Sequence, residues 1–157
     1  MAPPGTFTVR PMRYCLLTLS LTGFVALAGC SGAPHDKGAA RVRTPEAAIG
    51  VWHWEATVTP VETIGTANPE RYTLELQPGG AVLVRADCNR GRGSYKIREG
   101  RIEFGPIATT RMACPPGSLD SRYLKDLQRA TIFFIEGGKL FFDLPLDSGT
   151  MRFARGK

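Results

Sequence analysis

Four cysteines are the residues of this chain with the widest choice of chemistry: Cys15, Cys30, Cys88 and Cys114. A cysteine can act as a nucleophile, ligate a metal, carry a lipid or form a disulfide. The chain has only two histidines, and neither lies at metal-ligand spacing from a cysteine pair. Thiol catalysis and metal binding are therefore poorly supported, and the position of each cysteine must indicate its chemistry.

Residues 10–30 have the pattern of a secretory leader. The stretch begins with two arginines and continues with an apolar segment that is too short to span a bilayer. It ends in Leu-Ala-Gly-Cys at residues 27–30, which resembles a bacterial lipobox, where the cysteine takes a diacylglyceryl thioether and the chain is cut just before it. We expect a signal peptide over residues 1–29 and lipidation of Cys30. An ordinary secretory signal or an uncleaved anchor is the alternative, and either Met1 or Met12 could be the start.

A lipid on Cys30 would place the protein in the bacterial cell envelope, because two or three acyl chains on one residue anchor stably. Ser31, which follows the cysteine, is not Asp, and in enteric-type sorting this resembles outer-membrane cargo facing the periplasm. Residues 30–47 contain few bulky apolar side chains and predict a flexible tether. One folded domain is expected over residues 48–157.

The net charge of the chain excludes few classes of binding partner. Loss of the two leader arginines from 20 basic residues leaves 18 against 14 acidic residues, a net charge of +4. This fits attraction to an anionic envelope component, but an ordinary solvated surface has the same charge. Nucleic acid is not an expected partner, because the aromatic residues are not interleaved with the basic ones.

Cys88 and Cys114 remain once the leader is removed and Cys30 is lipidated. Two thiols in an oxidising compartment favour one disulfide. The chain-entropy model gives about 3–4 kcal/mol for a loop of this length. A catalytic or metal-bound thiol is the weaker alternative.

The elements that position these residues are mostly short strands, because apolar and polar residues alternate along most of the domain. A glycine-rich interruption at residues 91–93 is expected to break the pattern. Strands are predicted over residues 51–58, 71–77, 81–87, 94–98, 101–104, 131–136, 139–144 and 150–154.

A single segment has helical spacing, with Ser118 as the expected cap and an apolar stripe that includes Tyr123 and Leu127. About eight short antiparallel strands and one helix predict a mainly β fold, a small antiparallel barrel with the helix packed over one opening.

Two groups of residues could form a binding site. Asp87 and Asn89 flank Cys88, where short polar side chains can bond the backbone of a turn. In the alternative hypothesis they join Arg111 in a polar cluster at the barrel mouth. The arginines could then clamp a phosphate or carboxylate: Arg85, Arg90, Arg92 and Arg111.

Aromatic residues form the second group. Trp52 and Trp54 share one strand face and serve either as core or as a surface for ligand stacking or docking. Residues 133–134 and 141–142 are phenylalanine pairs, which place aromatic rings on both faces of one hairpin. The outer face needs cover from the helix or from a partner.

Five blocks of the sequence together form a recognisable pattern. They are Asp87-Cys88-Asn89-Arg90, Gly93-Ser94-Tyr95, Thr109 to Pro115, Leu124 with Leu127, and Gly149 to Phe153. In order and spacing these blocks resemble the META domain family, as in HslJ-like heat-shock lipoproteins, and the resemblance runs from about Trp52 to Phe153. It implies a small lipocalin-like antiparallel barrel with one helix, in proteins that are commonly lipid-anchored or periplasmic and linked to stress or drug tolerance. It implies no established enzymatic activity.

Three functions are compatible with the sequence. The first is a non-enzymatic envelope domain that binds a protein partner or supports an assembly. The second is a carrier of a small hydrophobic ligand in the barrel interior, although inward apolar side chains tend to fill so small a barrel. The third is an enzyme, for which no Ser–His–acid or Cys–His arrangement is evident. No cofactor or metal is expected.

Overall fold

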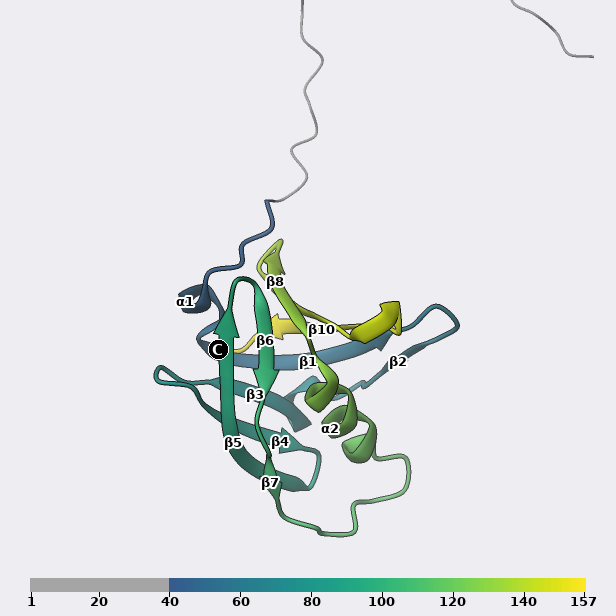
Figure 1. Ribbon diagram of the computed structural model, residues 1–157. Helices are drawn as coiled ribbons and strands as arrows, with labels where there is room; N and C mark the ends of the chain where they lie inside the picture. Colours follow the sequence, from purple (N-terminus) through teal and green to yellow (C-terminus); the bar gives the residue numbers. More distant parts are fainter. Residues whose placement is uncertain (1–39) are drawn as a thin grey trace, which may run out of the picture. The chain divides into compact units, whose positions relative to one another are not determined.

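The computed structural model describes residues 40–157. The predicted leader and the lipidation site Cys30 lie outside these residues. The described chain forms one antiparallel sheet, two α-helices and two short 3-10 helices (Figure 1). None of its helices is long and apolar enough to cross a bilayer. The strands are β1 (Gly50–Val58), β2 (Thr63–Gly65), β3 (Tyr72–Leu76), β4 (Ala81–Ala86), β5 (Asn89–Arg98), β6 (Arg101–Phe104), β7 (Ala108–Thr109), β8 (Ile132–Glu136), β9 (Lys139–Asp143) and β10 (Thr150–Arg155); the helices are α1 (Pro45–Ala48), η1 (Pro69–Arg71), α2 (Asp120–Arg129) and η2 (Pro145–Asp147).

The sheet closes into a barrel of eight antiparallel strands. The hydrogen-bonded order runs β10-β9-β8-β6-β5-β4-β3-β1, and β1 pairs with β10 to complete the circle. Two short strands lie off this path, with β2 on β1 and β7 on β5. Helix α2 packs on the barrel. The predicted fold class, a mainly β antiparallel barrel with one packed helix, is confirmed.

Alternation along the strands fills the barrel interior with side chains. Inward positions such as Leu74, Leu76 and Val82 are fully buried, as the period-two pattern predicted. Larger residues occupy the rest of the space, and seven aromatic residues are among the buried core with an exposure of 4% or less: Trp52, Trp54, Tyr72, Tyr123, Phe133, Phe142 and Phe153. The interior is therefore a packed core.

Strand β1 carries a bulge where its pairing with β10 shifts between Trp54 and Ala56. The bulged residue, Glu55, accepts hydrogen bonds from Lys139 Nζ and Arg152 Nε, both at 2.8 Å. The hydrogen bond from Lys139, assisted by Arg152, lowers the pKa of Glu55 against the opposing effect of burial. One carboxylate thus links β1, β9 and β10 on the outside of the barrel.

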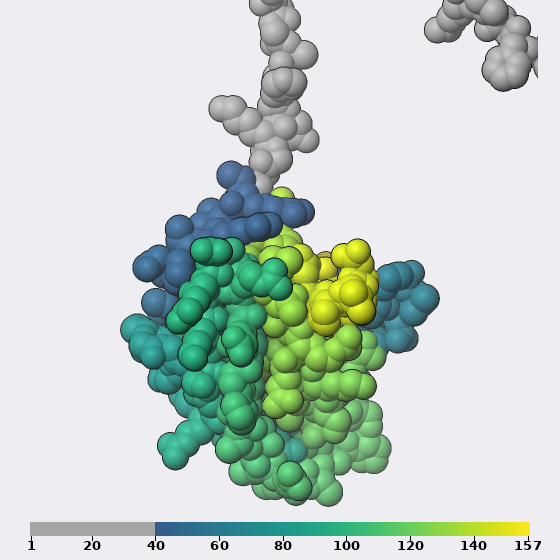
Figure 2. All heavy atoms as spheres, viewed as in Figure 1, coloured from purple at the N-terminus to yellow at the C-terminus, as the bar shows by residue number. Residues whose placement is uncertain are grey.

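The seam between β6 and β8 is the weakest closure of the barrel. Its ladder contains one residue pair, Arg101 with Ile132. Residues 41–43, which the sequence assigned to the tether, extend this seam, because Val42 exchanges backbone hydrogen bonds with Ile135. Figure 2 shows side chains of the β5–β6 region and of the α2–β8 region meeting along this line.

The same segment covers the outer phenylalanines. Phe134 and Phe141 stack with ring centroids 5.0 Å apart, and the Arg41 guanidinium lies 4.5 Å from the centroid of Phe134. Phe134 is buried as a result. The sequence predicted that the helix or a partner would cover this face. Residues 41–43, which lead into the domain, provide the cover instead.

Helix α2 faces the barrel with the predicted stripe: Tyr123 and Leu127 are fully buried. The helix begins at Asp120 rather than directly after Ser118, although the Ser118 hydroxyl still accepts a hydrogen bond from the Asp120 amide at 3.3 Å. Tyr123 packs against Trp54 and Tyr72, with ring centroids 5.3 and 5.8 Å away. The helix is therefore attached to the barrel through an aromatic cluster.

The predicted break at residues 91–93 is wrong, because strand β5 runs without interruption from Asn89 to Arg98. The glycines serve close packing. A Cβ on Gly91 would lie 2.6 Å from Thr109 Cγ2, and one on Gly93 would lie 2.7 Å from the Pro106 carbonyl oxygen. Only glycine lets the chain around β7 approach β5 this closely.

We expect Trp54→Ala to lower the free energy of unfolding by about 3–5 kcal/mol, because it removes a fully buried side chain from the aromatic cluster and leaves a cavity. Thermal and denaturant unfolding measure the change. Val61→Ala is the control, since Val61 is 89% exposed and its truncation should leave stability unchanged. Equal stability of the two variants would contradict the role of Trp54 in the core.

Candidate functional site

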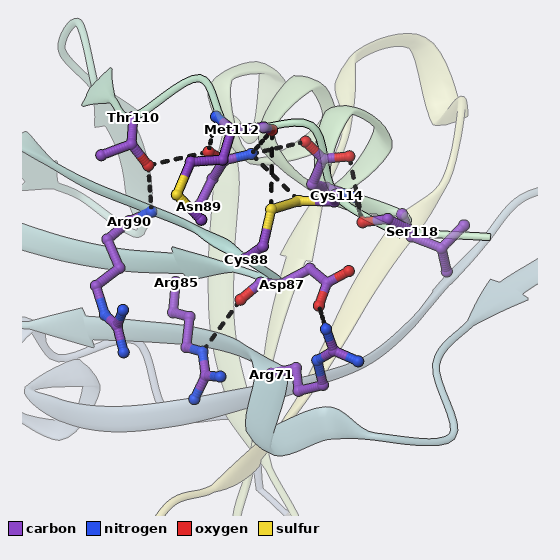
Figure 3. Close-up of a disulfide and its surroundings, with 12 residues drawn as sticks. Arg71, Arg85, Asp87, Cys88, Asn89, Arg90, Thr110, Met112, Cys114 and Ser118 are labelled. Carbon is purple, nitrogen blue, oxygen red and sulfur yellow. Dashed lines mark hydrogen bonds and ion pairs between the residues drawn. A yellow bond between two sulfur atoms is a disulfide. The ribbon is translucent and has the colours of Figure 1, made fainter. Parts of the chain in front are cut away.

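The predicted polar cluster lies around the turn between β4 and β5. Ala86 pairs with Asn89, so Asp87 and Cys88 form a two-residue turn, and Asp87 has a positive φ of 57°. Asp tolerates this conformation better than most residues. The buried Asp87 carboxylate forms an ion pair with Arg71, at the end of η1 (Figure 3). This ion pair attaches the turn to the segment directly before β3.

A disulfide holds the turn from the opposite side. Cys88 is bonded to Cys114, with Cα atoms 5.5 Å apart, and Cys114 lies in the loop that leads to α2. The structure contains the bridge that the cysteine count predicted. It ties the β4–β5 turn to the start of the helix (Figure 3).

Asn89 is the centre of a hydrogen-bond network beside the disulfide. Its Oδ1 accepts from the Met112 amide at 2.8 Å and from the Thr110 hydroxyl at 2.9 Å. Its Nδ2 contacts Met112 O at 3.1 Å, Asp120 Oδ2 at 3.2 Å and Cys114 Sγ at 3.3 Å. Both ends of the buried amide are in use, so Asn89 fastens the loop to the barrel and is not available to a ligand.

The other candidate residues are placed apart from this network. Arg111 is exposed and makes no ion pair within residues 40–157. Trp52 and Trp54 are buried, with exposures of 1% and 0%, so they offer no surface for stacking or docking. The Trp52 indole donates to the Ala48 carbonyl at 2.7 Å and closes the barrel near α1. These candidates therefore do not form one site.

The structure does bring three of the predicted arginines together on the outside of the barrel. Arg85 on β4 lies directly opposite Arg90 on β5, and Arg92 is the next outward residue along β5. Figure 3 shows the Arg85 and Arg90 side chains extending side by side. Arg85 is oriented by its Nε, which donates to the Asp87 carbonyl at 3.2 Å.

These arginines border a groove of about 660 Å³ on the outer face of β3, β4 and β5 and the segment at β7. Val51, Leu83 and Ala108 contribute apolar atoms to its lining, which also includes the acidic residue Glu75. Leu83 is 38% exposed there, although it belongs to a strand. An apolar floor beside arginines suits a ligand that carries both an anionic and an apolar part.

Chemically, the described residues offer binding rather than a metal centre. No group of three or more His, Cys, Asp or Glu side chains in residues 40–157 could hold a metal ion. Both cysteines of this part of the chain are in the disulfide. The groove contains no cysteine or histidine.

The chain belongs to the META domain family, whose model matches residues 48–156. This family match confirms the resemblance noted in the sequence. A search of curated proteins found no match.

Two solved structures match parts of this chain. A protein from Burkholderia xenovorans, determined by NMR, has a TM-score of 0.60 and 24% identity, covering 80% of this chain and 98% of that one. A DUF4847 family protein from Bacteroides vulgatus has a TM-score of 0.49 and 11% identity, covering 69% of this chain and 93% of that one. The first similarity supports the fold of the domain.

We expect Cys114→Ser to lower the free energy of unfolding by about 2–4 kcal/mol, because it removes the cross-link between the β4–β5 turn and α2. Thermal melting measures the loss. Cys88→Ser should give the same shift, and the parent protein in reductant should melt near both variants. Unchanged melting temperatures would argue that the bridge contributes nothing.

Proposed function

We propose that this protein is a lipid-anchored bacterial envelope protein whose META domain is a non-enzymatic binding module. It serves envelope stress or drug tolerance by docking a partner on the outer face of the barrel. The observation that carries the proposal is the arginine-bordered groove over β3, β4 and β5, on a domain whose interior is filled. The ligand therefore binds to the outside of the barrel.

The packed interior supports this function over the alternative, a carrier that holds a small hydrophobic ligand inside the barrel. Seven aromatic side chains converge in the space that a lipocalin-type ligand would need, and Trp54 and Phe153 among them are fully buried. Opening that space would require loss of the cluster that attaches α2. A surface ligand requires no such change.

The anchor in this proposal is the lipid on Cys30, supported by the lipobox-like sequence at residues 27–30. In this proposal the anchor and the groove have separate roles. The lipid keeps the domain at a membrane, in our proposal the periplasmic face of the outer membrane, and the groove selects the partner.

Intact mass of the protein purified from its native membrane tests the anchor. We expect the mass of residues 30–157 plus a lipid modification, with a gain of about two hydrogens on reduction because one disulfide opens. Cys30→Ala should release the protein from the membrane fraction. An unlipidated mass, or a Cys30→Ala variant that stays in the membrane, would contradict the anchor.

Site-specific photo-crosslinking in cells tests the groove as the docking surface. A photoreactive amino acid in place of Leu83 should give a covalent adduct, because this position lines the groove and is partly exposed. The matched control replaces Leu146, which is 99% exposed on η2 and does not line the groove. Absence of a Leu83 adduct, or equal adducts at both positions, would contradict docking in the groove.

A further inference from the structure

The groove holds more positive charge than the described chain neutralises. Arg85 and Arg90 are direct cross-strand neighbours, an arrangement that is destabilising for like charges. Neither of them, nor Arg92, forms an ion pair within residues 40–157. The one carboxylate in the lining, Glu75, accepts a hydrogen bond from Gln77 Nε2 at 2.8 Å. The charge of this surface is complementary to an anion.

The spacing of the two arginines suits a single phosphate. Directly opposite residues in an antiparallel pair have Cβ atoms about 4.5–5.5 Å apart, so two guanidinium groups can reach the same phosphate group. Arginine binds phosphate oxygens through paired N–H donors. Arg85 is already oriented, because its Nε donates to the Asp87 carbonyl at 3.2 Å and its Nη1 donates to the Glu70 carbonyl at 3.5 Å. This reduces the cost of ordering its side chain on binding and leaves its remaining N–H groups to bind the phosphate.

Apolar surface begins next to this clamp. Leu83 lies two residues before Arg85 on the same strand face, about 7 Å along the strand, and it pairs with Arg92. Val51 and Ala108 lie in the same cross-strand row as Leu83, with Glu75 between Val51 and Leu83 and Arg92 between Leu83 and Ala108. A ligand whose phosphate is held by the arginines would therefore place an attached hydrocarbon chain on Leu83.

The backbone beneath the groove is already hydrogen-bonded. Strand β4 is paired on both edges, with β3 and β5, and β5 is paired with β4 and with β6 and β7. A peptide therefore has no free edge of β4 or β5 on which to add as a strand. Recognition on this face must rely on side chains, which favours an amphiphile over an extended peptide.

A second arginine pair on the same barrel provides an internal comparison. Arg98 and Arg101 also lie directly opposite each other, on β5 and β6. The hollow they border contains two carboxylates, Glu99 and Glu103, and two further basic residues, Lys96 and Arg129. Its four basic and two acidic residues give the same formal charge, +2, as the three arginines and Glu75 give the groove. The β3–β4–β5 groove is therefore distinguished by its more apolar lining.

We propose that the groove binds an anionic phospholipid, with its phosphate between Arg85 and Arg90 and its acyl chain along Leu83. This assignment rests on the proposed surface-binding function and specifies its ligand class. The anchor is compatible with it, since the chain from Cys30 to Ala40 spans at most about 35 Å if fully extended. That reach exceeds the radius of gyration of about 14 Å expected for a domain of this size.

Photo-labelling in vesicles tests this assignment. The full chain is reconstituted into phosphatidylcholine vesicles that contain a trace of photoactivatable lipid, either phosphatidylglycerol or phosphatidylcholine with the same reactive acyl chain. Labelled peptides are identified by mass spectrometry. We expect phosphatidylglycerol to label the peptides that contain Leu83 and Ala108 about tenfold more than phosphatidylcholine does, because only its net charge is negative.

Paired variants make the test specific. Arg85→Gln with Arg90→Gln should reduce selective labelling about tenfold, since the phosphate clamp is lost. Arg98→Gln with Arg101→Gln removes the same charge from a second cross-strand pair and should leave labelling unchanged. Melting curves verify that both variants are folded. Equal labelling by the two lipids, or equal loss in the two double variants, would overturn the assignment.

The two proposals fail in different ways. A Leu83 photo-adduct in cells together with no lipid selectivity in vesicles would leave the surface-binding function standing and overturn the lipid assignment. Loss of both signals would overturn both. The intact mass of the purified protein reports on the anchor alone.

Discussion

The aromatic contact among Trp54, Tyr72 and Tyr123 is the interaction on which the rest of this domain depends. It joins β1, β3 and α2, three elements that are far apart in sequence. Its cost is real, because Trp54 Nε1 and Tyr123 OH are buried without a hydrogen-bond partner within residues 40–157, at about 1–3 kcal/mol for each such group. The apolar area of three large rings offsets this cost. The barrel interior is therefore a packed core.

A second set of contacts fixes the start of α2. The Cys88–Cys114 bond and the Asn89 amide both hold the loop before the helix, and the Tyr72 hydroxyl accepts a hydrogen bond from the Leu119 amide at 2.9 Å. These contacts meet at the β4–β5 turn. The turn also sets the register that places Arg85 opposite Arg90. The contacts that stabilise the helix therefore position the arginines of the groove as well.

Local patterns in the sequence were enough to predict the fold, but not the site. Alternation identified the buried faces of β3 and β4, and helical spacing identified Tyr123 and Leu127, because both signals depend on residues close in sequence. The cysteine count predicted the disulfide once the leader was set aside. The fold class followed from the number of strands and the single helix.

The groove could not be derived in the same way, because it depends on long-range pairing. The glycines at positions 91 and 93 suggested a break, and only the approach of the β7 segment explains why β5 continues through them. Without a continuous β5, the sequence gives no reason to place Arg90 and Arg92 on one strand face. Asn89 is a similar case, since its partners lie more than twenty residues away and a single asparagine has no periodic signal.

The charges on different faces of the barrel are compensated differently, and this difference supports the proposal that the groove binds a ligand. At the bulge in β1, Lys139 and Arg152 share the Glu55 carboxylate, so their charge is compensated within the domain. At the groove, Arg85 and Arg90 face each other and form no ion pair within residues 40–157, and Glu75, the carboxylate in the lining, is hydrogen-bonded to Gln77. Exposure to salt makes this tolerable, because charges at the surface are screened over about 8 Å at physiological ionic strength. The proposed binding role would explain why the barrel retains a pair with a small stability cost.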